Sequence, residues 1–223
     1  MSQNLQDRRI GLLGFGIEKR ALAHFLQSRK IPFSVCDTRQ PDAPLANVRE
    51  WRIGTDYLEG LTDFDLLFRT PGLSCLDPCL KAARESGVEI SSQTRLFLQL
   101  CPAPILGITG TKGKGTTTSI LHALLATDAA RVFSGGNIGR PPIAFLDELR
   151  SDDRGVLQLS SFQLQDLDLS PHIALALSIT EDHLDYHTDR AEYIAAKRPI
   201  CSHQKATDIL IVNQDCPTAR SFA

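Results

Sequence analysis

A stretch rich in glycine, lysine and threonine, from Gly107 to Thr118, has the residue types and spacing best suited to chemistry. It reads GITGTKGKGTTT, with a short apolar run before it and a helical pattern after it, as a phosphate-binding loop requires. Glycines let successive backbone N–H groups point at phosphate oxygens, and the helix N-terminus adds partial positive charge. Lys114 would reach the terminal phosphates of a nucleotide, and a hydroxyl just after it would hold magnesium. The spacing is not the standard G-x-x-x-x-G-K pattern, because Ile108 stands where that pattern has its first glycine.

A second glycine loop, GFGIEK from Gly14 to Lys19, follows the first apolar run of the chain. Asp37 lies about 20 residues further on, at the end of another apolar run, where a dinucleotide-binding fold keeps its ribose-binding acid. By itself this loop favours a nicotinamide dinucleotide and makes a dehydrogenase one hypothesis. Lys19 stands where the motif would have its third glycine, which weakens that hypothesis.

The elements that must position these loops are short apolar runs alternating with amphipathic segments. Strands are expected at 9–14, 33–36, 66–68, 105–109, 156–159, 173–177 and 209–212, and helices at 20–29, 78–86, 93–100, 116–126, 141–149 and 190–201. This alternation predicts parallel sheets with right-handed crossovers. Two prolines between Cys101 and Pro104 predict a domain boundary. We therefore expect an α/β protein with a Rossmann-like domain at 1–102 and a P-loop ATPase-type domain at 103–223.

The composition excludes several classes of protein. The chain is 42% hydrophobic and 22% charged, with a formal net charge of -2, which argues against nucleic-acid binding through an overall basic surface. Its polar first residues contain no signal peptide, and no apolar run reaches the ~18 residues that a membrane span needs. The cysteine spacing completes no zinc pattern, so reduced thiols in the cytoplasm are expected.

Several segments occur in an order that resembles the Mur ligases. The GTKGK loop followed by threonines is similar to the ATP loop shared by Mur ligases and folylpolyglutamate synthases. GGNIG at 135–139 resembles a loop that meets the sugar substrate, and LSSFQL at 159–164 resembles a signature of the ligase that adds D-glutamate. TEDHLD at 180–185 resembles the metal-site segment, and AAK at 195–197 the helix that carries a carbamylated lysine. These matches in order cover nearly the whole chain and are far more specific than any one alone.

The resemblance implies an ATP-dependent ligase of peptidoglycan precursor synthesis. ATP would phosphorylate the terminal carboxylate of UDP-N-acetylmuramoyl-L-alanine, and the amine of D-glutamate would attack the resulting acyl phosphate. Because the carboxylate and the triphosphate are both anions, the site must neutralise charge. The implied cofactors are ATP and Mg²⁺. A cytoplasmic monomer without nucleic-acid or membrane partners is expected.

The resemblance also gives individual residues their expected roles. Lys114 would neutralise charge, His183 would ligate magnesium, and Lys197, carrying a carbamate, would organise the metal site. The metal would be held by Thr116, Gln158, His183 and Lys197. The nucleotide would contact Gly110, Thr111, Lys112, Gly113, Lys114, Gly115 and Thr116. The UDP-linked substrate would contact Gly14, Gly16, Ile17, Glu18, Asp37, Thr38, Arg39 and Gly72, with its muramoyl part held by Asn137 and Gln163.

Three departures from the family pattern bear on these roles. Gly115 stands where close relatives have Ser or Thr, so Thr116 would supply the magnesium hydroxyl, as in the folylpolyglutamate branch. Gln158 stands where the family has a metal-binding glutamate; its amide oxygen brings no charge and cannot bind bidentately, which predicts weaker metal binding. The sequence stops at Ala223, before the family's remaining central strands and C-terminal domain, which predicts a partial central domain and a chain inactive alone.

Other functions remain open at this stage. A non-catalytic UDP-sugar or nucleotide-binding module would explain Gln158 and the early stop. A folylpolyglutamate synthase-like ligase would explain Gly115. An NAD-dependent oxidoreductase would use the first glycine loop but would leave residues 107–118 unexplained.

Overall fold

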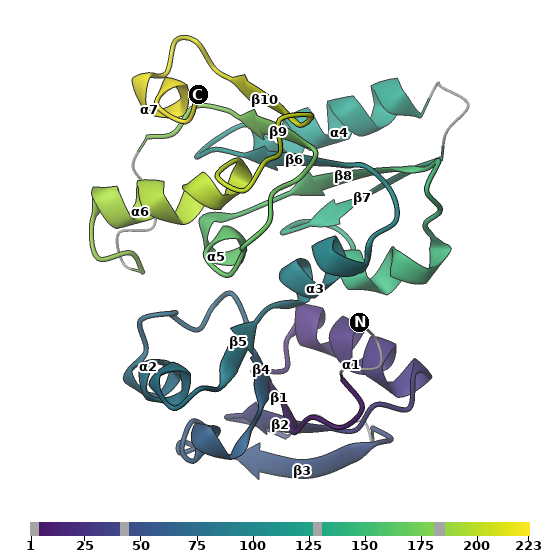
Figure 1. Cartoon of the computed structure of the whole chain (residues 1–223), viewed down its shortest axis with the longest axis vertical. Coiled ribbons are helices and arrows are strands. Elements are labelled where there is room, and N and C mark those ends of the chain that lie inside the picture. Colours follow the sequence, from purple (N-terminus) through teal and green to yellow (C-terminus); the bar gives the residue numbers. More distant parts are fainter. Residues whose placement is uncertain (1–4, 41–44, 127–130, 181–185) are drawn as a thin grey trace. The chain divides into compact units, whose positions relative to one another are not determined.

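The chain forms two compact units, Met1–Gln93 and Thr94–Ala223 (Figure 1). The structure is a computed structural model and describes residues 5–40, 45–126, 131–180 and 186–223. Each unit contains one five-stranded sheet in which every recorded strand pair is parallel. The prediction of two parallel α/β domains is thereby confirmed. The division between the units falls directly after Gln93, the first residue of helix α3 (Gln93–Leu100), whereas the prolines that suggested a boundary follow that helix.

The sheet of the first unit has the strand order β3-β2-β1-β4-β5. Its elements are β1 (Ile10–Leu13), α1 (Ile17–Ser28), β2 (Phe33–Asp37), β3 (Val48–Ile53), β4 (Leu66–Phe68), α2 (Pro78–Glu85) and β5 (Glu89–Ser91). The chain runs outward from β1 to one edge and then continues on the other side of β1, so the order reverses between β1 and β4. In open parallel sheets ligands bind at the carboxyl ends of the strands beside such a reversal. The first glycine loop follows β1 and therefore lies at this position.

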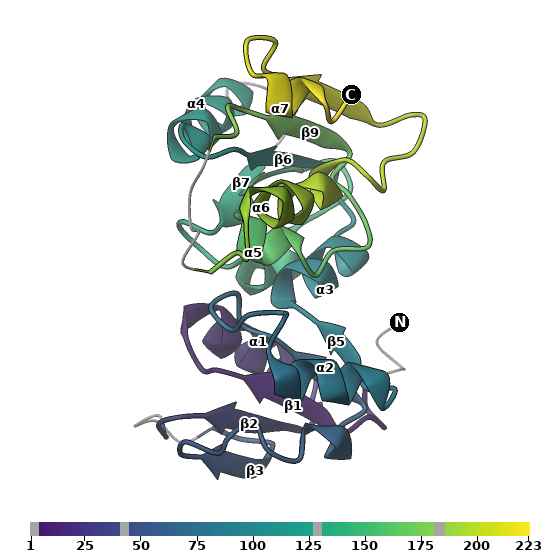
Figure 2. The same ribbon diagram turned by 90° about the vertical axis from the view of Figure 1, so that its left-hand side faces the viewer.

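The sheet of the second unit has the order β10-β9-β6-β8-β7, with β6 (Ile105–Thr109) in the centre. The other elements are α4 (Lys114–Leu125), β7 (Val132–Gly136), β8 (Arg154–Gln158), α5 (Ser161–Leu164), β9 (Ile173–Ala176), α6 (Arg190–Lys197), β10 (Ile209–Val212) and α7 (Pro217–Arg220), with 3-10 turns at Pro142–Glu148 and Arg198–Ile200. Helix α4 covers one face of the sheet, and α5 and α6 lie on the opposite face (Figures 1 and 2). The phosphate loop therefore emerges from the central strand between these two layers.

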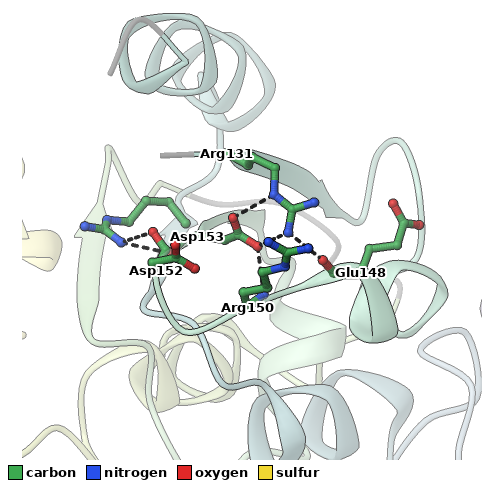
Figure 3. A network of polar contacts seen from close by, with 6 residues as sticks. Arg131, Glu148, Arg150, Asp152 and Asp153 are labelled. Carbon is green, nitrogen blue, oxygen red and sulfur yellow. Dashed lines mark hydrogen bonds and ion pairs between the residues drawn. The ribbon is translucent and has the colours of Figure 1, made fainter. Parts of the chain in front are cut away.

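A network of ion pairs and hydrogen bonds fixes the turn before β8 (Figure 3). The Asp153 carboxylate is buried and accepts two hydrogen bonds from the Arg131 guanidinium, at 3.0 and 2.7 Å, and one from the Arg150 amide at 2.7 Å. Arg131 also donates to the Glu148 carbonyl at 2.9 Å. The hydrogen bonds from Arg131 lower the pKa of Asp153, which keeps this buried carboxyl charged. The network thus joins Arg131, directly before β7, to the 3-10 turn at Pro142–Glu148 and to the turn that leads into β8.

Most predicted elements are present, with shifted ends and some additions. Helix α1 begins at Ile17 rather than residue 20, the segment at 141–149 forms a 3-10 turn, and the last predicted helix ends at Lys197 before a further 3-10 turn. Strands β3, β5 and β7 were not predicted, because they lie at sheet edges and lack a continuous buried run. No helix in the described ranges combines the length and apolarity that crossing a bilayer requires.

Candidate functional site

The phosphate loop depends on two glycines for different reasons. Gly113 caps the N-terminus of α4 with φ +84°, a left-handed conformation that favours glycine. Gly110 has φ +152°, and a Cβ there would lie 2.8 Å from the Leu177 Cβ and 3.2 Å from the Ser178 carbonyl oxygen. Gly113 therefore turns the backbone into the helix, and Gly110 lets the loop approach the end of β9 closely.

Two lysine side chains converge on the Gly110 carbonyl. The Lys114 ammonium donates to the carbonyl oxygens of Gly110 and Thr111, each at 2.9 Å, and so curls back across the loop. The Lys197 ammonium, on helix α6, donates to the same Gly110 oxygen at 3.3 Å. Lys197 is only 2% exposed and lies 4.5 Å from the centre of the Tyr193 ring. Because the first turn of α4 contains no acidic residue, this end of the sheet combines two ammonium groups with a positive helix terminus.

Gln158 and Asn137 meet at the carboxyl ends of β8 and β7. The Asn137 amide donates to the Gln158 carbonyl at 2.9 Å, and the exposed Asn137 side chain follows the loop turned by Gly136. The Gln158 side chain is 3% exposed, and its Oε1 lies 3.4 Å from where a Cβ on Gly115 would be. The Gln158 amide thus packs against the first turn of α4, in space that a side chain at position 115 would restrict.

The predicted contact residue Gln163 performs a second task as a helix cap. Ser160 and Gln163 form a capping box, in which the Gln163 Oε1 accepts from the Ser160 amide at 3.1 Å and the Ser160 hydroxyl accepts from the Gln163 amide at 3.3 Å. Gln163 is 1% exposed. Its side-chain oxygen therefore accepts a hydrogen bond that caps the N-terminus of α5, and its contact with a substrate stays a prediction.

The oxygen donors near the loop partly fit magnesium. The hydroxyl of Thr116, which is exposed on α4, and the amide of Gln158 are neutral oxygen ligands of a kind that Mg²⁺ accepts. Within the described ranges no cluster of three or more His, Cys, Asp or Glu side chains is placed to hold a metal. His183, the predicted ligand, lies outside the described residues. The negatively charged ligands of a metal bound here would be nucleotide phosphates or residues outside those ranges.

The first glycine loop is closed by the acid predicted to contact the ligand. The Asp37 carboxylate accepts from the Phe15 amide through one oxygen and from the Arg39 amide, at 3.1 Å, through the other. Each carboxylate oxygen keeps a further acceptor site, so these hydrogen bonds are compatible with a ligand hydroxyl at Asp37 and do not distinguish NAD from UDP. Gly14 has φ +74°, and a Cβ there would lie 2.9 Å from the Thr70 Cγ2. The ends of β1, β2 and β4 therefore meet at this loop.

The remaining residues predicted to contact the UDP-linked substrate lie around the same loop or the turn after β4. Ile17 is 71% exposed, which is unusual for a large apolar side chain. Glu18 is partly buried, and four further predicted residues are exposed: Gly16, Thr38, Arg39 and Gly72. Sequence reasoning missed Lys19, which is fully buried and donates to the Arg69 carbonyl at 2.9 Å. In the sequence, the only feature that singled out this residue was that a lysine stands where the dinucleotide motif has its third glycine.

Comparison with known proteins places these features in a family. A family model described as the Mur ligase middle domain matches residues 108–223, and one described as the Mur ligase MurD-like N-terminal domain matches residues 8–92. The chain belongs to the Mur ligase family. The resemblance found in the sequence is thereby confirmed, and the phosphate loop and both lysines lie within the Mur ligase middle domain.

The chain is also similar in sequence to named ligases of this family. The chain is 40% identical over 226 residues to the UDP-N-acetylmuramoylalanine--D-glutamate ligase of Symbiobacterium thermophilum, covering 98% of this chain and 50% of that protein. It is 37% identical over 220 residues to the protein of the same name from Clostridium kluyveri, covering 96% and 48%. The chain therefore spans about half the length of the curated relatives it matches.

Solved structures support the fold. The UDP-N-acetylmuramate:L-alanyl-gamma-D-glutamyl-meso-diaminopimelate ligase from Neisseria meningitides has a TM-score of 0.59 at 17% identity, covering 96% of this chain and 74% of that one. The UDP-N-acetylmuramate-alanine ligase from Thermotoga maritima has a TM-score of 0.52 at 17% identity, covering 97% and 51%. At this identity the likeness shows a shared fold.

Proposed function

We propose that this chain carries the precursor-binding and ATP-binding parts of a ligase that adds D-glutamate to UDP-N-acetylmuramoyl-L-alanine through an acyl phosphate. The name shared by the relatives reported above supports D-glutamate as the amino acid added and favours it over a folate substrate. Mg²⁺ would neutralise phosphate charge and orient the transferred group. The substrates, the cytoplasmic location and the monomeric state belong to the same proposal.

The convergence of Lys114 and Lys197 on the Gly110 carbonyl is the observation that carries this proposal. In a loop with a helix N-terminus directly behind it, the Lys114 ammonium offsets the charge of a triphosphate and of a carboxylate brought close to it. Lys197 reaches the same carbonyl, where a carbamate on its nitrogen would organise the metal site beside those phosphates. Asn137 and Gln158 lie at the carboxyl end of the same sheet, where the muramoyl end of the precursor must approach the γ-phosphate. The protein's part in the reaction is then positioning and electrostatic stabilisation.

Calorimetric titration of the precursor tests the proposal. UDP-N-acetylmuramoyl-L-alanine should bind more tightly than UDP, and Asn137→Ala should remove the difference between them because Asn137 would contact the muramoyl part. ADP should bind independently, and Lys114→Ala should abolish that binding. NAD is the matched control for the first glycine loop. Binding of NAD without binding of the precursor would refute the proposal.

A non-catalytic nucleotide or UDP-sugar module is the second candidate, favoured by the neutral Gln158 beside the loop. The two functions separate when the chain is joined to the C-terminal half of a full-length relative. A ligase should then release phosphate from ATP only when both the precursor and D-glutamate are present. A binding module would retain precursor affinity and release none.

A further inference from the structure

The side chain of Thr111 points away from the ligand side of the phosphate loop and into the protein. Its hydroxyl lies 3.0 Å from the Tyr193 hydroxyl and accepts a hydrogen bond from the Thr180 amide, also at 3.0 Å. Thr111 is 7% exposed and Tyr193 is 1% exposed, so the two hydroxyls meet in the interior, whereas Thr180 is exposed. The Thr111 amide donates to the Ser178 carbonyl at 2.8 Å. One loop residue is thus fastened both to helix α6 and to the segment after β9.

A second set of contacts holds Tyr193 in place by joining α6 to α5. His187 lies between the Ser161 hydroxyl, 2.9 Å from its Nε2, and the Glu192 carboxylate, which contacts its Nδ1. Glu192 also accepts from the Gln165 amide at 2.6 Å. Hydroxyl, imidazole and carboxylate occur here in the order of a nucleophilic triad. Ser161 is 1% exposed, however, so this arrangement joins two helices rather than attacks a substrate.

Aromatic packing makes this junction rigid. The His187 ring stacks on Phe162 with ring centres 5.4 Å apart and an angle of 11°, and meets Tyr193 edge to face at 5.1 Å. Tyr193 follows Glu192 directly, so the chain of contacts runs without a gap from α5 through His187 to the Tyr193 hydroxyl. A hydroxyl held on a buried ring has little freedom to follow a moving loop.

We propose that Tyr193 is a positioning residue for nucleotide phosphates, acting through the Thr111 hydroxyl to hold the phosphate loop in its binding conformation. The inference rests on the proposed nucleotide-binding role of the loop. Loop N–H groups bind phosphate only when several point inward together, and a loop that samples other conformations loses affinity in proportion to the time spent in them. Tyr193 itself touches no ligand.

Nucleotide affinity in four variants of the full chain tests this inference. Tyr193→Phe removes only the hydroxyl and should weaken ADP binding about five-fold, close to 1 kcal/mol, as expected for one lost hydrogen bond. Thr111→Val should weaken it further because the Thr180 amide also loses its acceptor, whereas Thr111→Ser keeps the hydroxyl and should bind nearly as wild type. Tyr57→Phe removes a phenol hydroxyl from the first unit and is the matched control, with affinity unchanged.

The double variant Tyr193→Phe/Thr111→Val separates positioning from a general loss of stability. If the two hydroxyls act through each other, the double variant should bind ADP about as weakly as Thr111→Val alone. If the affinity losses of the two single variants instead multiplied in the double variant, the inference would be overturned. It would also be overturned if Tyr193→Phe bound ADP as tightly as the wild type.

Amide hydrogen exchange without nucleotide gives a readout that is independent of binding. The amides of Thr111 and Thr180 should exchange faster in Tyr193→Phe and at the wild-type rate in Tyr57→Phe. Unchanged exchange in Tyr193→Phe would overturn the inference. A wild-type chain that binds no ADP would refute the proposed function, and the exchange rates would then decide by themselves whether Tyr193 holds the loop.

Discussion

Replacing Gly136 by alanine should distort the loop that carries Asn137, and Gly139 in the same loop provides a matched control. Both glycines have positive φ, +114° at Gly136 and +85° at Gly139. A Cβ on Gly136 would lie 2.1 Å from the Gln158 carbonyl oxygen, whereas at Gly139 the nearest heavy atom would be 4.0 Å away. Both substitutions therefore strain the backbone, but only the first also produces a collision.

The difference in free energy of unfolding follows from that contact. Backbone strain at a positive φ costs ~1–2 kcal/mol in either variant. Relieving the collision at Gly136 requires the ends of β7 and β8 to separate, which adds ~1–3 kcal/mol of overpacking and weakens the hydrogen bond from Asn137 to Gln158. We expect a loss of about 2–5 kcal/mol for Gly136→Ala and about 1–2 kcal/mol for Gly139→Ala.

Urea unfolding measures this difference and contains its own control. Trp51 is the only tryptophan and lies on β3 of the first unit, so its fluorescence reports that unit, whereas far-UV circular dichroism reports both. With a urea dependence of about 1–3 kcal/mol per M, the second-unit midpoints of the two variants should differ by about 1 M. The Trp51 midpoint should not move. Equal shifts for the two variants would refute the reasoning, because the collision would then have no cost.

Three further predictions concern charge and reactivity. Hydrogen bonds from Arg9 lower the pKa of Asp65 to about 2, so the stability from this pair is present above pH ~4 and lost as the pH falls towards 2; Arg9→Gln should reduce that loss in an acid titration. Burial raises the pKa of the Cys36 thiol to about 12, so alkylation followed by mass spectrometry at neutral pH should label the exposed Cys79 and spare Cys36. Gln158→Glu should tighten Mg²⁺ binding to the chain with ADP bound, since it adds a charged ligand beside the loop; an unchanged titration would count against Gln158 as a metal ligand.

The sequence by itself determined the features that depend on neighbouring residues. A short apolar run, glycines and a following helical pattern place the phosphate loop after Thr109, and the structure has the strand, the loop and the helix in this order, with the helix beginning at Lys114 rather than at the expected residue 116. Alternating strands and helices were sufficient to predict parallel sheets, because parallel strands need crossover connections. The segments that resemble the Mur ligases identified the family for the same reason, since each is a contiguous run.

Only the tertiary structure decided what the site side chains contact. Asp37 has the spacing of a ribose-binding acid, yet its carboxylate closes the loop after β1 through the Phe15 amide. Thr111 is spaced as a ligand residue, yet its hydroxyl contacts Tyr193. In each case the partner lies far away in the sequence and is brought close by sheet order and helix packing. Spacing along the chain therefore predicts where a side chain lies, whereas its hydrogen-bond partner depends on which distant element packs beside it.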